Sequence, residues 1–267
     1  MLHLRDISLT FNPGTVNEKT ALSHLSLRLA PGDFATVIGS NGAGKSTLLG
    51  AVAGSLPVDS GSITLDGQDV TFLPNHRRSV VIGRLFQDPL RGTAPSLTIE
   101  ENLALAYLRS RKEKTNPFSR INRRDKEFFA EKLKLLGMGL EDRMRQPVGL
   151  LSGGQRQALT LLMATLVTPK LLLLDEHTAA LDPAAAEKVL ELTRSIVAQH
   201  RITCLMVTHN MRQALDLGNR TLMMADGNIV LDLSGSERAG MTVDGLLRRF
   251  KAGTGEDLDN DRMLLSD

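Results

Sequence analysis

Aromatic residues and net charge are both scarce in this sequence. Tryptophan is absent, tyrosine occurs once, and aromatic residues make up 3% of the 267 residues. Surfaces that bind single-stranded nucleic acid stack its bases on aromatic side chains, so this composition argues against such a surface. The 32 basic and 30 acidic residues give a formal net charge of +2, which is too small to attract nucleic acid or anionic lipid globally. We therefore expect no nucleic-acid partner.

Cysteine and long apolar segments are scarce as well. Cys204 is the only cysteine, so the chain cannot form an internal disulfide or a cysteine-based zinc site, which fits a reducing compartment. The most apolar segment, Ala158 to Val167, has about half of the ~20 residues that a membrane-spanning helix needs. The N-terminus lacks the pattern of a signal peptide. If the protein works at a membrane, we expect a partner to hold it there.

The remaining composition, 42% apolar and 23% charged, is that of a globular chain, and its patterns change along the sequence. Alternating or short apolar runs predict strands at Leu2–Phe11, 25–29, 34–38, 62–65 and 80–86. A helix is predicted over Lys45–Ala53, ended by Gly54. These elements indicate a mixed lobe in the first part of the chain.

Helical patterns dominate from about 89 to 150, notably at 99–109 and 126–136. Buried strands at 171–174 and 203–208 then alternate with helices at 155–166 and 184–200, as in a parallel sheet covered by helices. A hairpin is predicted over 221–233 and a helix over 243–250. The acidic segment 251–267 is expected to be a flexible tail.

The segment Gly39-Ser-Asn-Gly-Ala-Gly-Lys45-Ser46 matches the pattern G-x-x-x-x-G-K-[ST] of a phosphate-binding loop, or P-loop. It lies between a predicted strand and a predicted helix, which is the context the pattern requires. In such a loop backbone N–H groups wrap the phosphates, the lysine neutralises them, and the hydroxyl binds magnesium. The predicted nucleotide contacts are Gly39, Ser40, Asn41, Gly42, Ala43, Gly44, Lys45, Ser46 and Thr47, with Ser46 also a magnesium ligand.

Two carboxylates follow the all-apolar run 171–174. Parallel sheets bind ligands at the carboxyl ends of their strands, which is where Asp175 and Glu176 stand. We predict that Asp175 holds magnesium and that Glu176 polarises the attacking water.

The string Leu151-Ser152-Gly153-Gly154-Gln155 opens a predicted helix. A serine and two glycines at a helix start expose N–H groups and the positive end of the helix dipole, which suits an anion. An ordinary helix cap uses the same residue types, and the pattern alone does not decide between an anion site and a helix cap. The predicted nucleotide contacts here are Ser152, Gly153, Gly154 and Gln155.

Together these motifs resemble those of the ATP-binding cassette (ABC) ATPases, from about Leu2 to Leu233. The likeness rests on the P-loop, the LSGGQ string, the strand ending in Asp175-Glu176, and Ala180-Leu181-Asp182 after it. It implies an α/β fold with a P-loop NTPase core, a parallel sheet with helices on both faces, an antiparallel β lobe and a helical insert at about 89–150, all within an ATPase domain of residues 1–250. It also implies ATP and Mg²⁺ as cofactors, and a dimer that sandwiches two ATP molecules head to tail, each P-loop facing the partner's LSGGQ.

The resemblance assigns four more residues. Gln87 matches the family's glutamine loop, which touches magnesium and the attacking water, and His209 matches the switch histidine that contacts the γ-phosphate. Asp182 matches the loop that couples the two sites across the dimer. Phe11 is the candidate aromatic that stacks on adenine, although a role as a strand core residue is nearly as plausible.

One position departs from the family pattern. His177 stands between the catalytic glutamate and a threonine, where the family usually has proline, and a freer backbone follows. Both carboxylates and the switch histidine are present, so hydrolysis is expected to survive. Together with Gly14-Thr-Val-Asn-Glu18, the run from Glu176 to Pro183 resembles a subgroup of import cassettes that serve amino-acid-like solutes through a branched-chain-type permease.

The resemblance implies the ATP-hydrolysing subunit of a transporter that imports solute, peripheral at the cytoplasmic face of the cell membrane. Its implied partners are transmembrane permease subunits, a second cassette, identical or closely related, and a solute-binding protein. An ATPase that drives a non-transport membrane complex and a soluble mechanoenzyme remain alternatives, although no heptad-repeat arm separates the P-loop from LSGGQ. The basic segment 109–126 is expected to be a solvated face or a contact with lipid headgroups or acidic permease loops.

Overall fold

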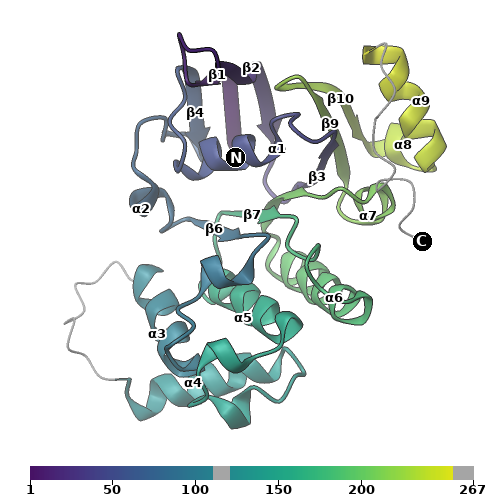
Figure 1. The fold of residues 1–267 in the computed structure, drawn as a ribbon. Helices are drawn as coiled ribbons and strands as arrows, with labels where there is room; N and C mark the ends of the chain where they lie inside the picture. The colour runs from purple at the N-terminus through teal and green to yellow at the C-terminus, as the bar shows by residue number, and fades with distance from the viewer. Residues whose placement is uncertain (111–120, 255–267) are drawn as a thin grey trace. The chain divides into compact units, whose positions relative to one another are not determined.

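The computed structural model describes residues 1–110 and 121–254, and these form two compact units (Figure 1). The first unit is discontinuous in sequence and combines residues 1–78 with the chain from 201 onward. The second unit is residues 79–200. Most of the basic segment 109–126 and the chain after 254 lie outside the described residues.

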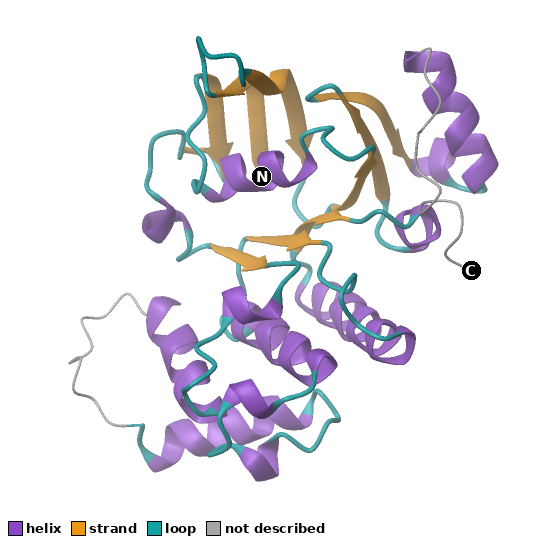
Figure 2. Ribbon diagram, viewed as in Figure 1, coloured by secondary structure: helices purple, strands orange, loops and turns teal. Residues whose placement is uncertain are grey.

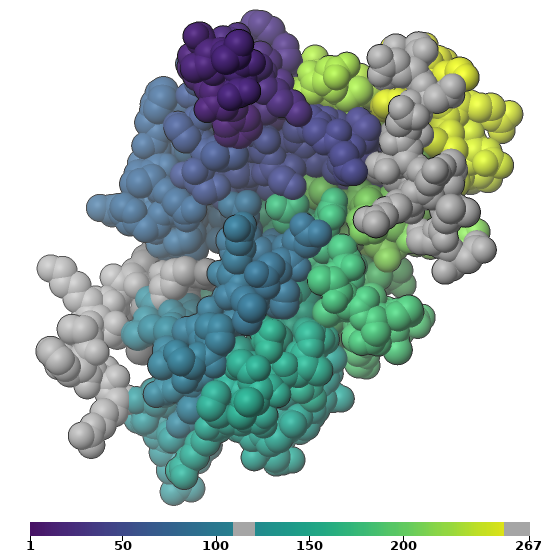
Figure 3. All heavy atoms as spheres, in the orientation of Figure 1, coloured from purple at the N-terminus to yellow at the C-terminus, as the bar shows by residue number. Residues whose placement is uncertain are grey.

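The first unit contains the antiparallel sheet predicted for the start of the chain. Its strand order is β2 (Lys19–Leu29), β1 (Leu2–Phe11), β4 (Ser60–Leu65), β5 (Gln68–Asp69). Most apolar residues of β1 and β2 are buried, and they alternate with polar ones as predicted except near Asp6 and His24, where the register shifts. The turn between these two strands, residues 12–18, is exposed and lies at the surface in Figure 3.

A second group of strands in the first unit carries the P-loop. β3 (Phe34–Gly39) pairs in parallel with β8 (Thr203–Val207) on one side and with β9 (Arg220–Ala225) on the other. β10 (Asn228–Ser234) forms the predicted hairpin with β9. Every residue of β3 and β8 is buried, because helices α1 (Lys45–Ala53) and α7 (Met211–Asp216) pack on these strands (Figure 2).

The C-terminal helices close an apolar cluster of the first unit. After the short helix α8 (Gly235–Arg238), helix α9 (Val243–Thr254) buries Leu246 and Phe250 against Ile38 and Met223. This helix runs past the predicted start of the tail at residue 251. The difference has a physical reason: Phe250 anchors the last turn in the cluster, so the helix continues beyond it. A further short helix, α2 (Asn75–Arg78), ends the first segment of this unit.

The second unit is mostly helical. β6 (Ile82–Leu85) and β7 (Leu171–Asp175) pair in parallel, and helix α5 (Gly153–Thr165) contacts β6 and the helices α3 (Ile99–Ser110), α4 (Arg123–Lys134) and α6 (Pro183–His200). Single 3₁₀ turns lie at Pro89–Gly92, Glu141–Arg143 and Val148–Leu150. Along residues 1–110 and 121–254, no helix combines the length and apolar character needed to cross a membrane.

Candidate nucleotide-binding and catalytic site

The P-loop joins β3 to α1 in the first unit. Two of its glycines lie so close to neighbouring backbone that a side chain would clash there. A Cβ atom on Gly39 would lie 2.2 Å from the carbonyl oxygen of Met224, and one on Gly44 would lie 2.4 Å from that of Ala21. Gly44 also has a φ of +97°, in the left-handed region that side chains disfavour. The backbone of this loop is therefore built against two neighbouring strands, and larger residues do not fit.

Lys45 is the first residue of α1 and is buried beneath the loop that precedes it. Its ammonium group donates hydrogen bonds to the carbonyl oxygens of Gly39 at 2.8 Å and Ser40 at 2.9 Å. Gly44 occupies the N-cap position and has no side chain to cap the helix. A helix start without a side-chain cap, next to a buried ammonium, is suited to bind phosphate.

Lys19 is a residue near the P-loop that the sequence motifs do not reveal. Its ammonium nitrogen lies 3.2 Å from the position that a Cβ atom on Gly42 would occupy. Lys19 is also the register partner of Phe11, at the end of the β1–β2 pair. Phe11 is 37% exposed and so is not a core residue, which leaves its ring available for stacking. Only the pairing of β1 with β2 could have identified Lys19, since no motif contains it.

His209 lies at the same edge of the sheet as the P-loop. The pairing of β3 with β8 ends at Val37 and Val207, and the backbone N–H of Thr208 donates to the carbonyl oxygen of Val37 at 3.1 Å. The P-loop and His209 thus follow the carboxyl ends of adjacent parallel strands, which is where open sheets bind ligands. The structure brings these two motifs together within the first unit.

The second unit holds the candidate carboxylates and Gln87. β6 and β7 are in register at Leu85 and Leu174, so Gln87 and the pair Asp175 and Glu176 follow the ends of neighbouring strands. Both carboxylate residues are half-buried. Asp175 in this unit and Ser46 in the first unit each carry oxygen of the type that Mg²⁺ prefers as a ligand. Burial lowers the pKa of Arg84 on β6, and the charge of Asp175 partly offsets this effect.

His177, the departure from the family pattern, is buried in the second unit. Its Nε2 atom lies 3.1 Å from the hydroxyl of Thr193 on α6. Burial lowers the pKa of His177 to about 4, so its imidazole is neutral near pH 7. The position lacks the rigid ring of a proline, but a hydrogen bond to Thr193 fixes the orientation of the His177 side chain.

The LSGGQ residues begin helix α5 and form a capping box. The hydroxyl of Ser152 accepts a hydrogen bond from the N–H of Gln155, whose side chain accepts one from the N–H of Ser152. A Cβ atom on Gly154 would lie 2.7 Å from that of Ala185, and one on Gly153 would lie 3.2 Å from the side chain of Leu181. The glycines therefore allow close packing against the segment that contains Asp182.

Asp182 caps helix α6. Its carboxylate accepts a hydrogen bond of 3.0 Å from the N–H of Ala185. The second unit thus contains Gln87, Asp175, Glu176, Asp182 and the LSGGQ residues, whereas the P-loop, Lys19, Phe11 and His209 belong to the first unit.

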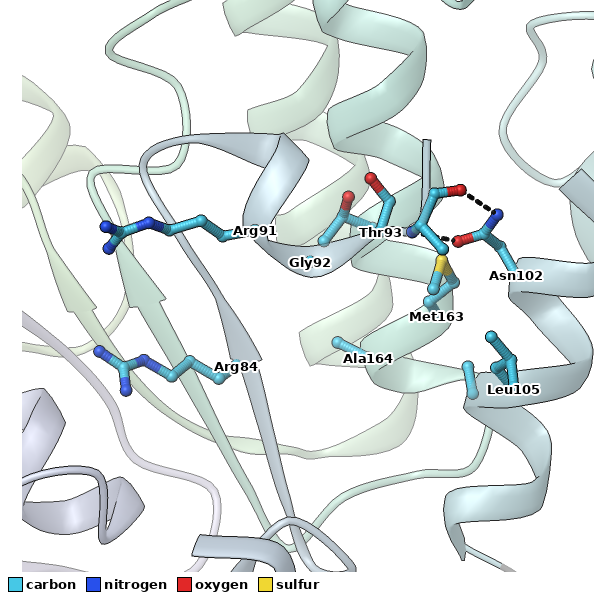
Figure 4. A pocket seen from close by; sticks show the side chains of 11 residues that line it. Arg84, Arg91, Gly92, Thr93, Asn102, Leu105, Met163 and Ala164 are labelled. Atoms are coloured by element: carbon cyan, nitrogen blue, oxygen red, sulfur yellow. Dashed lines mark hydrogen bonds between the residues drawn. The ribbon is translucent and has the colours of Figure 1, made fainter. Parts of the chain in front are cut away.

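A cavity of about 310 Å³ lies among β6, α3 and α5 of the second unit. Figure 4 shows the side chains of Arg84 and Arg91 extending to the same side, with Leu105 and Met163 at the other end. Asn102 holds the backbone of Ala94, another residue that lines the cavity, because its side chain donates to the carbonyl oxygen of Ala94 and accepts from the N–H of Ala94. The cavity combines positive charge with apolar surface.

Comparison with known proteins agrees with the motifs. A family model described as ABC transporter matches residues 22–179. The chain is 41% identical over 251 residues to the tyrosine transport ATP-binding protein of Clostridioides difficile strain R20291, covering 94% of this chain and 99% of that protein. It is 36% identical over 206 residues to the thiamine import ATP-binding protein ThiQ of Shigella flexneri, covering 76% and 82%.

Solved structures give the same result for the fold. The ATP-binding cassette MJ0796, in a dimeric post-hydrolysis state bound to ADP and Pi, is similar with a TM-score of 0.75 and 25% identity, covering 88% of this chain and 98% of that one. This chain belongs to the ABC transporter family. It is an α/β ATPase that binds and hydrolyses ATP, as the motifs predict.

Proposed function

We propose that the chain is the ATPase subunit of a membrane importer, and that it works as a dimer around two MgATP. The observation that carries this proposal is a P-loop built around Lys45 in one unit and an LSGGQ helix start in the other, two distinct anion-binding elements in one cassette. A cassette with both elements can present its P-loop to one nucleotide and its LSGGQ to another. Two copies, or this chain and a close relative, then complete both sites.

The site residues have separate roles in this proposal. Lys45 and the P-loop backbone hold the phosphates, and His209 contacts the γ-phosphate. Glu176 accepts a proton from the attacking water, and Asp182 couples the two sites. Phe11 stacks on adenine.

Magnesium would be held by Ser46, Asp175 and Gln87, and when bound it neutralises charge on the phosphates. Ser152, Gly153, Gly154 and Gln155 contact the nucleotide of the partner cassette. The exposed positions of Ser152 and Gly153 support this role, because such a contact must be reached from outside.

The membrane partners are permease subunits, which the cavity of the second unit is suited to contact. Its two arginines favour an acidic group on the permease, and Leu105 and Met163 favour an apolar one. The chain is then peripheral, at the cytoplasmic face, and a solute-binding protein delivers the cargo.

An amino-acid-like solute is the proposed cargo, since the relative that matches nearly the whole chain is a tyrosine transport protein. Both relatives are named for transport or import, which disfavours a non-transport complex or a soluble mechanoenzyme.

The test is the variant Glu176→Gln, assayed for ATP turnover and for oligomeric state with MgATP. We expect it to bind ATP, to accumulate as a dimer, and to hydrolyse with little turnover, because the amide cannot accept the proton. Normal steady-state turnover would overturn the assignment of the base. A variant that stays monomeric with MgATP, with and without permease, would overturn the dimer.

A further inference from the structure

The backbone of the proposed catalytic glutamate has an unusual conformation. Glu176 has a φ of +43°, a left-handed conformation that costs a residue with a side chain about 1–2 kcal/mol. Such a conformation persists only where the surrounding structure imposes it. The neighbouring hydrogen bonds show what imposes it here.

Residues 176–182 form a compact segment between β7 and α6. The N–H of Ala179 donates to the carbonyl oxygen of Glu176 at 3.0 Å, and the N–H of Leu181 donates to that of Thr178 at 3.2 Å. Asp182 fixes the end of the segment by capping α6. The segment is therefore fixed at its C-terminal end by the side-chain cap of Asp182, and at its N-terminal end it continues from strand β7.

His177 links this segment to helix α6 through a side-chain hydrogen bond to Thr193. Its side chain is 1% exposed, and Thr193, about three turns into α6, is completely buried. The hydroxyl hydrogen of Thr193 is already donated to the carbonyl oxygen of Val189 at 2.8 Å. The same hydroxyl must therefore accept from His177, so Nε2 carries the proton and Nδ1 has a bare lone pair.

This arrangement is costly if its purpose is stability alone. The Nδ1 atom of His177 is buried and has no hydrogen-bond partner within the part of the chain that the structure describes. A buried acceptor left without a partner costs about 1–3 kcal/mol. Buried groups of this kind call for an explanation, and the position next to Glu176 provides one.

We propose that His177 is a positioning residue for hydrolysis: its bond to Thr193 fixes the backbone of Glu176 on helix α6 and so aims the Glu176 carboxylate. The inference rests on the proposed function, in which Glu176 acts as the base. A misplacement of about 1 Å at such a group costs up to ~100-fold in rate, so the tether acts on turnover and not on ATP affinity. The proline usual in the family restricts the same backbone by its ring, and here a side-chain bond does so.

The experiment compares isosteric pairs at both ends of the bond. His177→Gln keeps an N–H donor at the ε position, whereas His177→Asn places its amide one atom closer to the backbone, out of reach of Thr193. Thr193→Ser keeps the hydroxyl, and Thr193→Val removes it at nearly equal volume. We expect His177→Asn and Thr193→Val to lower kcat by roughly 10- to 100-fold with KM for ATP little changed. The Gln and Ser variants should recover most of the rate.

A stability control separates positioning from folding. Leu192→Ala removes buried side-chain volume from the same helix at a position about 100° around it from Thr193, and should lower the unfolding midpoint while leaving kcat unchanged. Wild-type kcat in folded His177→Asn and Thr193→Val would overturn the inference. A parallel assay of Glu176→Gln distinguishes the two levels: if that variant turns over normally, the proposed base itself is wrong and the inference falls with it. If it is inactive while both tether variants are normal, only the inference fails.

Discussion

The side-chain nitrogen of Lys45 lies 2.8 Å from the carbonyl oxygen of Gly39, to which it donates a hydrogen bond. The P-loop thus folds around its own lysine, and the ammonium group donates hydrogen bonds to two carbonyl oxygens of the loop, those of Gly39 and Ser40. Because this charge is placed by the loop before any ligand arrives, phosphate meets a preformed site.

Replacing this lysine should weaken nucleotide binding. Lys45→Ala removes a charged donor worth about 1.5–3 kcal/mol to a phosphate, so we expect ATP affinity to fall by roughly 10- to 100-fold. Calorimetric titration with MgATP measures the effect. Lys134→Ala, at an exposed position of α4, is the matched control. Equal affinity in the two variants would contradict the assignment.

Lys19 should contribute less, because it is exposed. Lys19→Ala should lower ATP affinity by about 2- to 5-fold, and the difference from wild type should shrink as salt rises and screens the charge. Lys19→Arg keeps the charge and should bind nearly as well. A loss that is independent of salt would assign Lys19 a packing role instead.

Alanine substitutions at Gly44 and at Gly67 should lower the free energy of unfolding by different amounts. A Cβ on Gly67 meets no atom within 4 Å, so Gly67→Ala should cost only the ~1–2 kcal/mol of a left-handed φ. Gly44→Ala bears a similar cost and adds a contact of 2.4 Å with the backbone of Ala21, so its loss should be larger by about 1–3 kcal/mol. Urea unfolding of both variants checks the order, and equal losses would show that the loop can relax.

Arg78 should be essential for stability at the other end of α1. Its guanidinium group is 3% exposed and donates to the carbonyl oxygens of Leu73, Ala51, Val52 and Thr71 at 2.8–2.9 Å. Arg78→Met would remove the guanidinium donors from these buried carbonyl oxygens, while Ala51 would keep the N–H of Gly54, and we expect a loss of about 2–4 kcal/mol. Arg78→Lys should recover little, because an ammonium group cannot reproduce the planar fork. Chemical denaturation measures both, and full recovery by lysine would show that charge alone matters.

The cavity of the second unit makes a prediction about assembly. Arg91→Glu replaces one of the two positive charges of the cavity with a negative charge, and should lower the amount of permease that copurifies with the ATPase. Lys134→Glu makes the same charge change on an exposed site of this unit and should have little effect. Equal losses from both variants would indicate a general charge effect and would remove the cavity from the proposed interface.

Local signals made part of the fold predictable. Helix α1 has the predicted bounds because glycines in left-handed conformations stand at both of its ends, Gly44 and Gly54. The start of β2 was missed, since the register of β1 with β2 shifts near His24, whose φ is +50°, and the alternation of apolar residues breaks there. Helix α7 was missed because its six residues are too few to show a helical period.

The candidate site was predictable where one continuous stretch of chain forms it. The P-loop and LSGGQ depend on local backbone geometry, and their glycines can be read from the sequence. Lys19 depends on the pairing of two strands, and the bond between His177 and Thr193 joins residues sixteen positions apart. No sequence period links such pairs, so only tertiary structure reveals them.

The central strand β3 has partners on both sides that come from beyond residue 200. The N–H of Gly227, in the turn after β9, also donates to the carbonyl oxygen of Ala43 within the P-loop. During synthesis on the ribosome, the nascent chain therefore carries a complete phosphate-binding sequence long before the walls that shape it exist. We therefore expect the loop to take its phosphate-binding shape only after translation has passed the β9–β10 turn.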